Sequence, residues 1–96
     1  MTKSEVILAI ARKTGIDKED VKNTIDELFR VIQDAVIDDH RVHFSGFGSF
    51  SKKKRAKKIG RNISTNTAIV VEEHYIPFFK HSKFFAAKIK AVGATT

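Results

Sequence analysis

The residues with the clearest chemical potential are the cations in the middle of the chain. Seven of the ten residues 52–61 are Lys or Arg, and no Asp or Glu interrupts them. One or two charges are enough to protect an exposed strand edge from aggregation, so edge protection does not explain a run of this density. Clustered cations of this kind are typical of surfaces that bind a polyanion, and the run therefore predicts a nucleic-acid interface.

The basic charge is confined to the second part of the sequence. Residues 1–40 carry six Lys or Arg against nine Asp or Glu, whereas residues 41–96 carry twelve against two, and the chain has a net charge of +7. This asymmetry is what a localised nucleic-acid footprint requires.

Two helices are predicted before the basic region. Thr2 and Glu5 have the spacing of a capping box, and Gly15 is suited to a left-handed C-cap. Asp17 is suited to cap a second helix, whose apolar residues follow at helical spacing over residues 21–36. Because this apolar stripe is long, we expect the second helix to be the main packing helix. The helix is also rich in acidic residues, which makes it a poor reader of the DNA major groove.

Strands are predicted next. Val42 and Phe44 alternate with polar residues, and a Gly-rich turn leads into residues 47–50, which predicts a hairpin whose phenylalanines face the core. Apolar alternation stops after Phe50, so we expect the strand to leave the core as a basic ribbon. Pro77 is expected to end the returning strand of the ladder.

The ribbon tip and the last helix follow from turn formers and caps. Residues 62–67 are rich in turn formers, and Asn66 is suited to a positive φ angle. Ser82 is suited to cap a final helix in which Phe85 and Ile89 share an inward face. The last residues, 93–96, are expected to fray.

Size and composition set limits on assembly and location. With 96 residues, 42% of them hydrophobic, the chain is one small domain, and residues committed to a ribbon are lost from its core. We therefore expect a dimer. The chain has no cysteine, which excludes disulfides and thiolate metal sites. Its first residues, 1–5, lack the apolar core of a secretory signal, so we expect none, and no apolar run is long enough to span a membrane. We expect a cytoplasmic protein with no membrane partner.

Other motifs favour structural roles. His40 and His43 have a spacing seen in metal sites, but no carboxylate or cysteine cluster completes one. The glycines of residues 46–48 lack the third glycine and the helix of a dinucleotide loop, so a tight turn is the better interpretation. No set of nucleophile, base and oxyanion donor can be assembled. We expect no enzyme activity, no small-molecule substrate, no cofactor and no metal.

Several motifs occur along the chain in a fixed order and spacing: Gly46-Phe47-Gly48-Ser49-Phe50, Arg55, Gly60-Arg61-Asn62, Thr65, Ile69, Pro77, Phe79 and Lys83. With the order of elements over residues 1–92, these motifs resemble the bacterial HU and integration host factor family of histone-like DNA-binding proteins. The fold implied is α+β: two N-terminal helices, a three-stranded antiparallel sheet with a long protruding β-ribbon arm, and a short C-terminal helix, in an intertwined dimer. The body would comprise residues 1–52 and 73–92, and the arm about residues 53–72.

The resemblance implies two sets of site residues. DNA contacts in the minor groove and on the flanks of the body are assigned to Lys3, Lys53, Arg55, Lys58, Arg61, Asn62, Ile63, Lys80 and Lys83. The dimer core is assigned to Phe29, Phe44, Phe47, Phe50 and Phe79.

Three positions depart from the family pattern. Ile63 stands where family arms usually carry the proline that wedges between base pairs, and isoleucine is also an apolar wedge. Asn66 and Ser82 replace glycines at the arm tip and before Lys83, and both residues suit their sites.

The function expected is that of a homodimeric, nucleoid-associated protein that binds and bends duplex DNA, helps to compact the chromosome, and prefers bent, nicked or junction DNA. Two alternatives share its electrostatics: a binder of double-stranded RNA or of mixed nucleic acids, and a cationic module for membranes or polysaccharides. The second would show a basic amphipathic helix, whereas most of the cations here lie on predicted strands.

Overall fold

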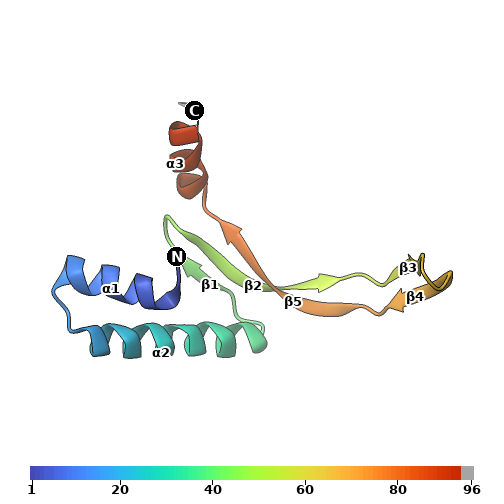
Figure 1. The fold of residues 1–96 in the computed structure, drawn as a ribbon, viewed down its shortest axis with the longest axis horizontal. Coiled ribbons are helices and arrows are strands. Elements are labelled where there is room, and N and C mark those ends of the chain that lie inside the picture. Colours follow the sequence, from blue (N-terminus) through green and yellow to red (C-terminus); the bar gives the residue numbers. More distant parts are fainter. Residues whose placement is uncertain (94–96) are drawn as a thin grey trace. The chain divides into compact units, whose positions relative to one another are not determined.

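The computed structural model describes residues 1–93, which fall into two compact units, residues 1–34 and the unit that begins at Ala35 (Figure 1). In chain order the elements are two helices, five strands and a third helix. Of the helices in the described residues, none is long and apolar enough to cross a membrane. The α+β class predicted from the sequence is confirmed.

The first unit is an α-helical hairpin. Helix α1 spans Lys3–Thr14 and ends at Gly15, whose φ of 75° is the predicted left-handed cap. Its N-terminus is capped by Thr2, whose hydroxyl oxygen accepts the Glu5 N–H at 3.3 Å. Helix α2 spans Lys18–Ile37, and the Asp17 carboxylate accepts the Glu19 N–H at 3.3 Å. Both predicted helix starts are confirmed.

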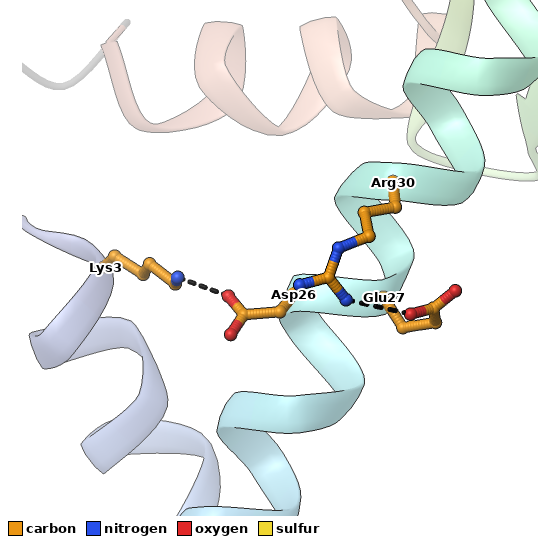
Figure 2. Close-up of polar contacts among 4 residues, drawn as sticks. All are labelled: Lys3, Asp26, Glu27 and Arg30. Atoms are coloured by element: carbon orange, nitrogen blue, oxygen red, sulfur yellow. Dashed lines mark hydrogen bonds and ion pairs between the residues drawn. The ribbon is translucent and has the colours of Figure 1, made fainter.

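The two helices of the first unit pack through a small apolar contact and are also joined by one ion pair. Ile7 and Val21 are the buried apolar side chains, with exposures of 5% and 4%. Lys3 pairs with Asp26, which joins α1 to α2 (Figure 2). The stripe on α2 is predicted to pack, yet its member Phe29 is 46% exposed. The part of the apolar α2 face that contains Phe29 is therefore not fully covered within a single chain.

The second unit contains a three-stranded antiparallel sheet in the order β1-β2-β5, formed by Val42–Phe44, Gly48–Arg55 and His74–His81. The prediction that Pro77 ends the ladder is wrong, because β5 continues through Pro77, which lies opposite Lys52. The reason is position: β5 is an edge strand paired only with β2, so one side of its backbone needs no N–H donor.

Beyond this sheet the same chain segments form a two-stranded ribbon. Strand β3 spans Lys58–Asn62 and pairs in antiparallel fashion with β4, Thr67–Val71. Strand pairing is interrupted at residues 56–57 and 72–73 (Figure 1). The predicted arm therefore consists of two paired stretches: the ends of β2 and β5, and the ribbon of β3 and β4. At the tip, Asn66 has a φ of 53°, as predicted.

Helix α3 spans Lys83–Gly93. Its cap is confirmed, since the Ser82 hydroxyl accepts the Phe85 N–H at 3.1 Å. Phe85 and Ile89 line one hollow together with Phe79 of β5, as expected of a shared inward face, but in a single chain Ile89 is not buried and remains 61% exposed. Residues 93–96 were expected to fray. Gly93 is instead the last residue of α3, and residues 94–96 lie outside the described residues.

Candidate nucleic-acid interface

The ribbon carries its cations free of intramolecular partners. Arg55, at the end of β2, and Lys58 and Arg61, on β3, are exposed. Within residues 1–93 none of the three forms an ion pair or a side-chain hydrogen bond. Since successive residues of a strand point to opposite faces, Lys58 and Arg61 place positive charge on both faces of the ribbon. All three remain available to phosphate groups.

The first lysines of the basic run are held by the protein itself. The Lys52 Nζ donates to the Ile37 carbonyl at 3.2 Å and lies 5.0 Å from the centre of the Tyr75 ring. This contact places a cation at the C-terminus of α2, whose own last turn contains no basic residue. The Lys53 Nζ, predicted to contact DNA, lies over the Phe78 ring at 4.7 Å.

Two ion pairs flank the interruption between the body sheet and the ribbon. The Lys54 Nζ lies 3.3 Å from Glu73, and the Lys57 Nζ lies 3.8 Å from Glu72. All four side chains are more than half exposed. Exposed pairs of this kind stabilise a fold by about 0–1 kcal/mol, so a phosphate group competes for these lysines at little cost.

The ribbon tip presents an apolar side chain on a structured turn. The Asn62 Oδ1 accepts the Ser64 N–H at 3.0 Å, and the hydroxyls of Thr65 and Thr67 are 2.6 Å apart. Ile63, between these contacts, is 92% exposed. The Asn62 oxygen accepts this bond within the turn, and the amide nitrogen of Asn62, a donor without a partner in residues 1–93, is available to a base edge.

A second basic area lies on the body. Lys80 and Lys83, both predicted to bind phosphate, line a hollow of about 360 Å³ together with Arg41, His43 and His81. We call it the flank hollow. The sequence analysis missed the last three residues. Strand register brings His43 beside Lys80, because His43, Ser49 and Lys80 lie side by side across β1, β2 and β5, but register cannot be read from residue types.

Lys3, the remaining predicted DNA contact, is engaged in the first unit. Its ammonium donates a hydrogen bond to the Asp26 carboxylate, and this bond lowers the pKa of Asp26 below its ordinary value (Figure 2). The neighbouring charges of Lys22 and Arg30 act in the same direction. A phosphate group has to draw Lys3 away from Asp26 before it can bind there.

Four of the five phenylalanines assigned to a dimer core lie together in the second unit. The Phe50 ring is 4.8 Å from Phe79 and 6.2 Å from Phe44, and the Phe47 ring is 5.3 Å from Phe79. Phe85, which that assignment omitted, stacks on Phe47 at 5.6 Å. The cluster is only partly covered, since Phe47 is 47% and Phe79 is 37% exposed.

Gly48 allows this cluster to close. A Cβ at residue 48 would lie 2.6 Å from the Lys80 carbonyl oxygen and 2.6 Å from the Phe79 ring. Any side chain would therefore push β5 or Phe79 away from β2.

The histidines do not build a metal site within residues 1–93, where no group of three His, Asp or Glu could hold an ion. The Nδ1 of His43 is instead 2.7 Å from the Ser49 hydroxyl.

Comparison with known proteins places this geometry in context. The model of a family described as "Bacterial DNA-binding protein" matches residues 1–90. DNA-binding protein HU of Thermotoga maritima is 38% identical over 90 residues, which cover 94% of this chain and all of that protein. Anabaena HU, solved in a cocrystal with DNA, aligns with a TM-score of 0.87 and 30% identity over 93% of this chain and 97% of that one.

A mutant of Thermotoga maritima HU aligns with a TM-score of 0.72 and 30% identity over 94% of this chain and all of that one. A mutant of transcription factor 1, solved in solution, is only 22% identical and shares the fold, with a TM-score of 0.64 over the full length of both chains.

Proposed function

Because the chain belongs to the family of bacterial DNA-binding proteins that includes HU, we propose that it is an architectural protein that binds duplex DNA through the minor groove and bends it. The observation that carries this proposal is the ribbon: it leads from unpartnered cations to the exposed Ile63 at its tip. Cations on both faces neutralise phosphates, and an apolar tip is suited to part a base step.

The proposal includes weak sequence preference. Phosphate contacts position a protein on DNA but carry no sequence information, and the edges of bases in the minor groove are nearly degenerate. Preference then arises from how easily the DNA deforms, so nicked, bent or four-way-junction DNA is favoured over straight duplex. A protein that bends DNA in this way contributes to compaction of the nucleoid.

We further propose that the active species is a homodimer. Ile7 and Val21 are the only apolar side chains of the described residues that are buried in a single chain. The phenylalanine cluster and Phe29 are left partly exposed, which supports a partner that covers them. Sedimentation equilibrium should give twice the mass of the 10.8 kDa chain, and a monomer at micromolar concentration would contradict the proposal.

The salt dependence of binding tests the electrostatic part of the proposal. With about eight phosphate contacts per dimer, log Kobs plotted against log salt concentration should have a slope of about −7. A slope shallower than about −3 would contradict it. Arg61→Ala should weaken binding to every duplex and make the slope shallower by about 2, because each dimer loses two contacts.

Lys88→Ala is the matched control, because Lys88 is an exposed lysine of α3 outside the predicted interface. A binder of A-form RNA would carry the same charge pattern, so competition between RNA and DNA duplexes at fixed salt separates the two functions.

A further inference from the structure

Gly60 lies in the middle of β3, where nothing within residues 1–93 requires a glycine. Gly15 and Gly46 have φ angles of 75° and 78°, and Gly48 lies against β5. Gly60, in contrast, has no positive φ angle. A Cβ at residue 60 would meet only the Ile69 carbonyl oxygen within 4 Å, at the ordinary contact distance of 3.9 Å. The fold therefore has room for a side chain at this position.

A glycine inside a strand also weakens the strand. Glycine loses more backbone entropy on folding than any other residue, and it contributes no side chain to cross-strand packing. The ribbon has only the pairing of β3 with β4, so it has few other interactions to offset this loss. Glycine in a strand is typical of a site where a ligand or another backbone approaches closely. Since no such approach occurs within residues 1–93, Gly60 indicates an approach from outside the chain.

Strand register shows which side chains share a face of the ribbon with Gly60. Gly60 lies opposite Ile69, and side chains two residues apart on a strand point to the same face. The glycine face, as we call it, therefore contains Gly60 and Ile69 together with the pairs Lys58–Val71 and Asn62–Thr67. The outer face contains Ile59 opposite Val70 and Arg61 opposite Ala68. Residues 58–71 contain no Asp or Glu.

The glycine face combines the groups that the minor groove of DNA can accept. Ile69 and Val71, 46% and 45% exposed, offer apolar surface to the C–H groups of the deoxyribose walls. The Asn62 amide nitrogen is a donor, and base edges in the minor groove present mainly acceptors. That groove is only about 6 Å wide, so a face without a side chain at residue 60 can approach its floor more closely than the outer face can.

We propose that the ribbon enters the minor groove with the glycine face against the DNA, and that Gly60 sets how deeply the ribbon enters. The inference rests on the proposed DNA-binding function and adds to it the face of the ribbon that meets the DNA. Lys58 then points into the groove. Arg61, on the outer face, has a side chain long enough to reach phosphates at the rim, so cations on both faces still neutralise phosphates.

The test is to add a side chain at residue 60 and to measure both the order of the ribbon and its affinity for DNA. In Gly60→Ala and Gly60→Val, amide hydrogen exchange in β3 and β4 should be as slow as in wild type or slower, because both residues suit a strand better than glycine does. Affinity for a nicked duplex should fall about tenfold for alanine and further for valine, since the added methyl groups overpack the contact. The salt slope should stay that of wild type, because no cation is lost.

Ala68→Val is the matched control for added bulk, because Ala68 lies on the outer face of the same ribbon. Its affinity should remain within about twofold of wild type.

A second pair of variants tests the apolar surface without adding bulk. Val70 and Val71 are neighbours on β4 with similar exposures of 50% and 45%, but they lie on opposite faces. Threonine has nearly the shape of valine and places a hydroxyl on that surface. Val71→Thr should weaken binding severalfold at an unchanged salt slope, whereas Val70→Thr should have little effect.

Wild-type affinity in Gly60→Val overturns the inference while leaving DNA binding in place, as do equal losses in Gly60→Val and Ala68→Val. Faster amide exchange in β3 and β4 of the Gly60 variants also overturns it, because Gly60 would then serve the fold of the ribbon. A wild type that binds no DNA overturns the proposed function itself.

Discussion

The body sheet and the ribbon are formed by consecutive stretches of the chain but are stabilised in different ways. In the body, Gly48 and Ser49 are buried and the rings of Phe50 and Phe79 pack against each other. In the ribbon, every residue of β4 is exposed. The ribbon is therefore held by strand pairing and by its turn, not by burial. Its side chains are free to serve a ligand, whereas those of the body are committed to packing.

Phe50→Ala tests the packing of the body and should cause the largest loss of stability among the variants considered. Loss of a packed phenylalanine costs about 3–5 kcal/mol, which is a large fraction of the stability of a domain this small. Chemical denaturation should show a correspondingly lower unfolding midpoint.

Ile59→Ala is the control in the ribbon, where Ile59 is 76% exposed, and it should change stability by no more than about 0.5 kcal/mol. Equal stability losses at the two sites would mean that the ribbon is packed as well as the body is.

Ile63→Ala tests the ribbon as a tool for bending. The substitution removes the apolar tip but no cation, so affinity for duplex DNA should be largely retained while bending falls. Ligase-mediated circularisation of short duplexes should slow severalfold. Circularisation at the wild-type rate would remove Ile63 from the role of wedge.

Most of the architecture could be predicted from the sequence because it depends on local signals. Caps at Thr2, Gly15, Asp17 and Ser82 are set by the chemistry of single residues, and the structure has each of them. The residue at which a strand ends depends less on local sequence. Pro77 breaks a ladder only where its missing N–H would face a neighbouring strand, and edge position is a property of the assembled sheet.

The candidate site divides in the same way. The arm cations are contiguous in sequence and were found there, whereas the flank hollow draws Arg41 and His43 from one segment and Lys80 and His81 from another. Sequence reasoning found its two lysines through the resemblance alone. Strand register, which brings the two segments together, could not be obtained from residue types.

The acidic residues between the body sheet and the ribbon, Glu72 and Glu73, allow a further test of how free the arm cations are. Replacing Glu72 and Glu73 with Gln frees Lys57 and Lys54 from their ion pairs. DNA binding should then tighten by about 1 kcal/mol, or roughly fivefold in Kd, because phosphate no longer competes with a carboxylate.

Glu27→Gln is the matched control, since it breaks the exposed pair with Arg30 on α2 (Figure 2), and it should leave the affinity of the ribbon unchanged. Gel-shift titration distinguishes the outcomes. Because the first variant removes two carboxylates and the control removes one, an equal gain per carboxylate removed would reflect net charge and not the position of the carboxylates.

Asp26→Asn tests the ion pair of the helical unit, and its effects on stability and on DNA affinity should be the smallest. Because the Lys3 hydrogen bond lowers the pKa of Asp26, the pair stabilises the fold above the ordinary pKa of the carboxyl group and is lost as pH falls through the lowered value. The variant should therefore be slightly less stable than wild type at neutral pH and equally stable in acid. It also frees Lys3, so DNA should bind slightly more tightly at neutral pH. Thermal melting as a function of pH measures the change in stability, and gel shifts measure the change in DNA affinity. If the variant remained less stable than wild type in acid, Asp26 would act through packing and not through its charge.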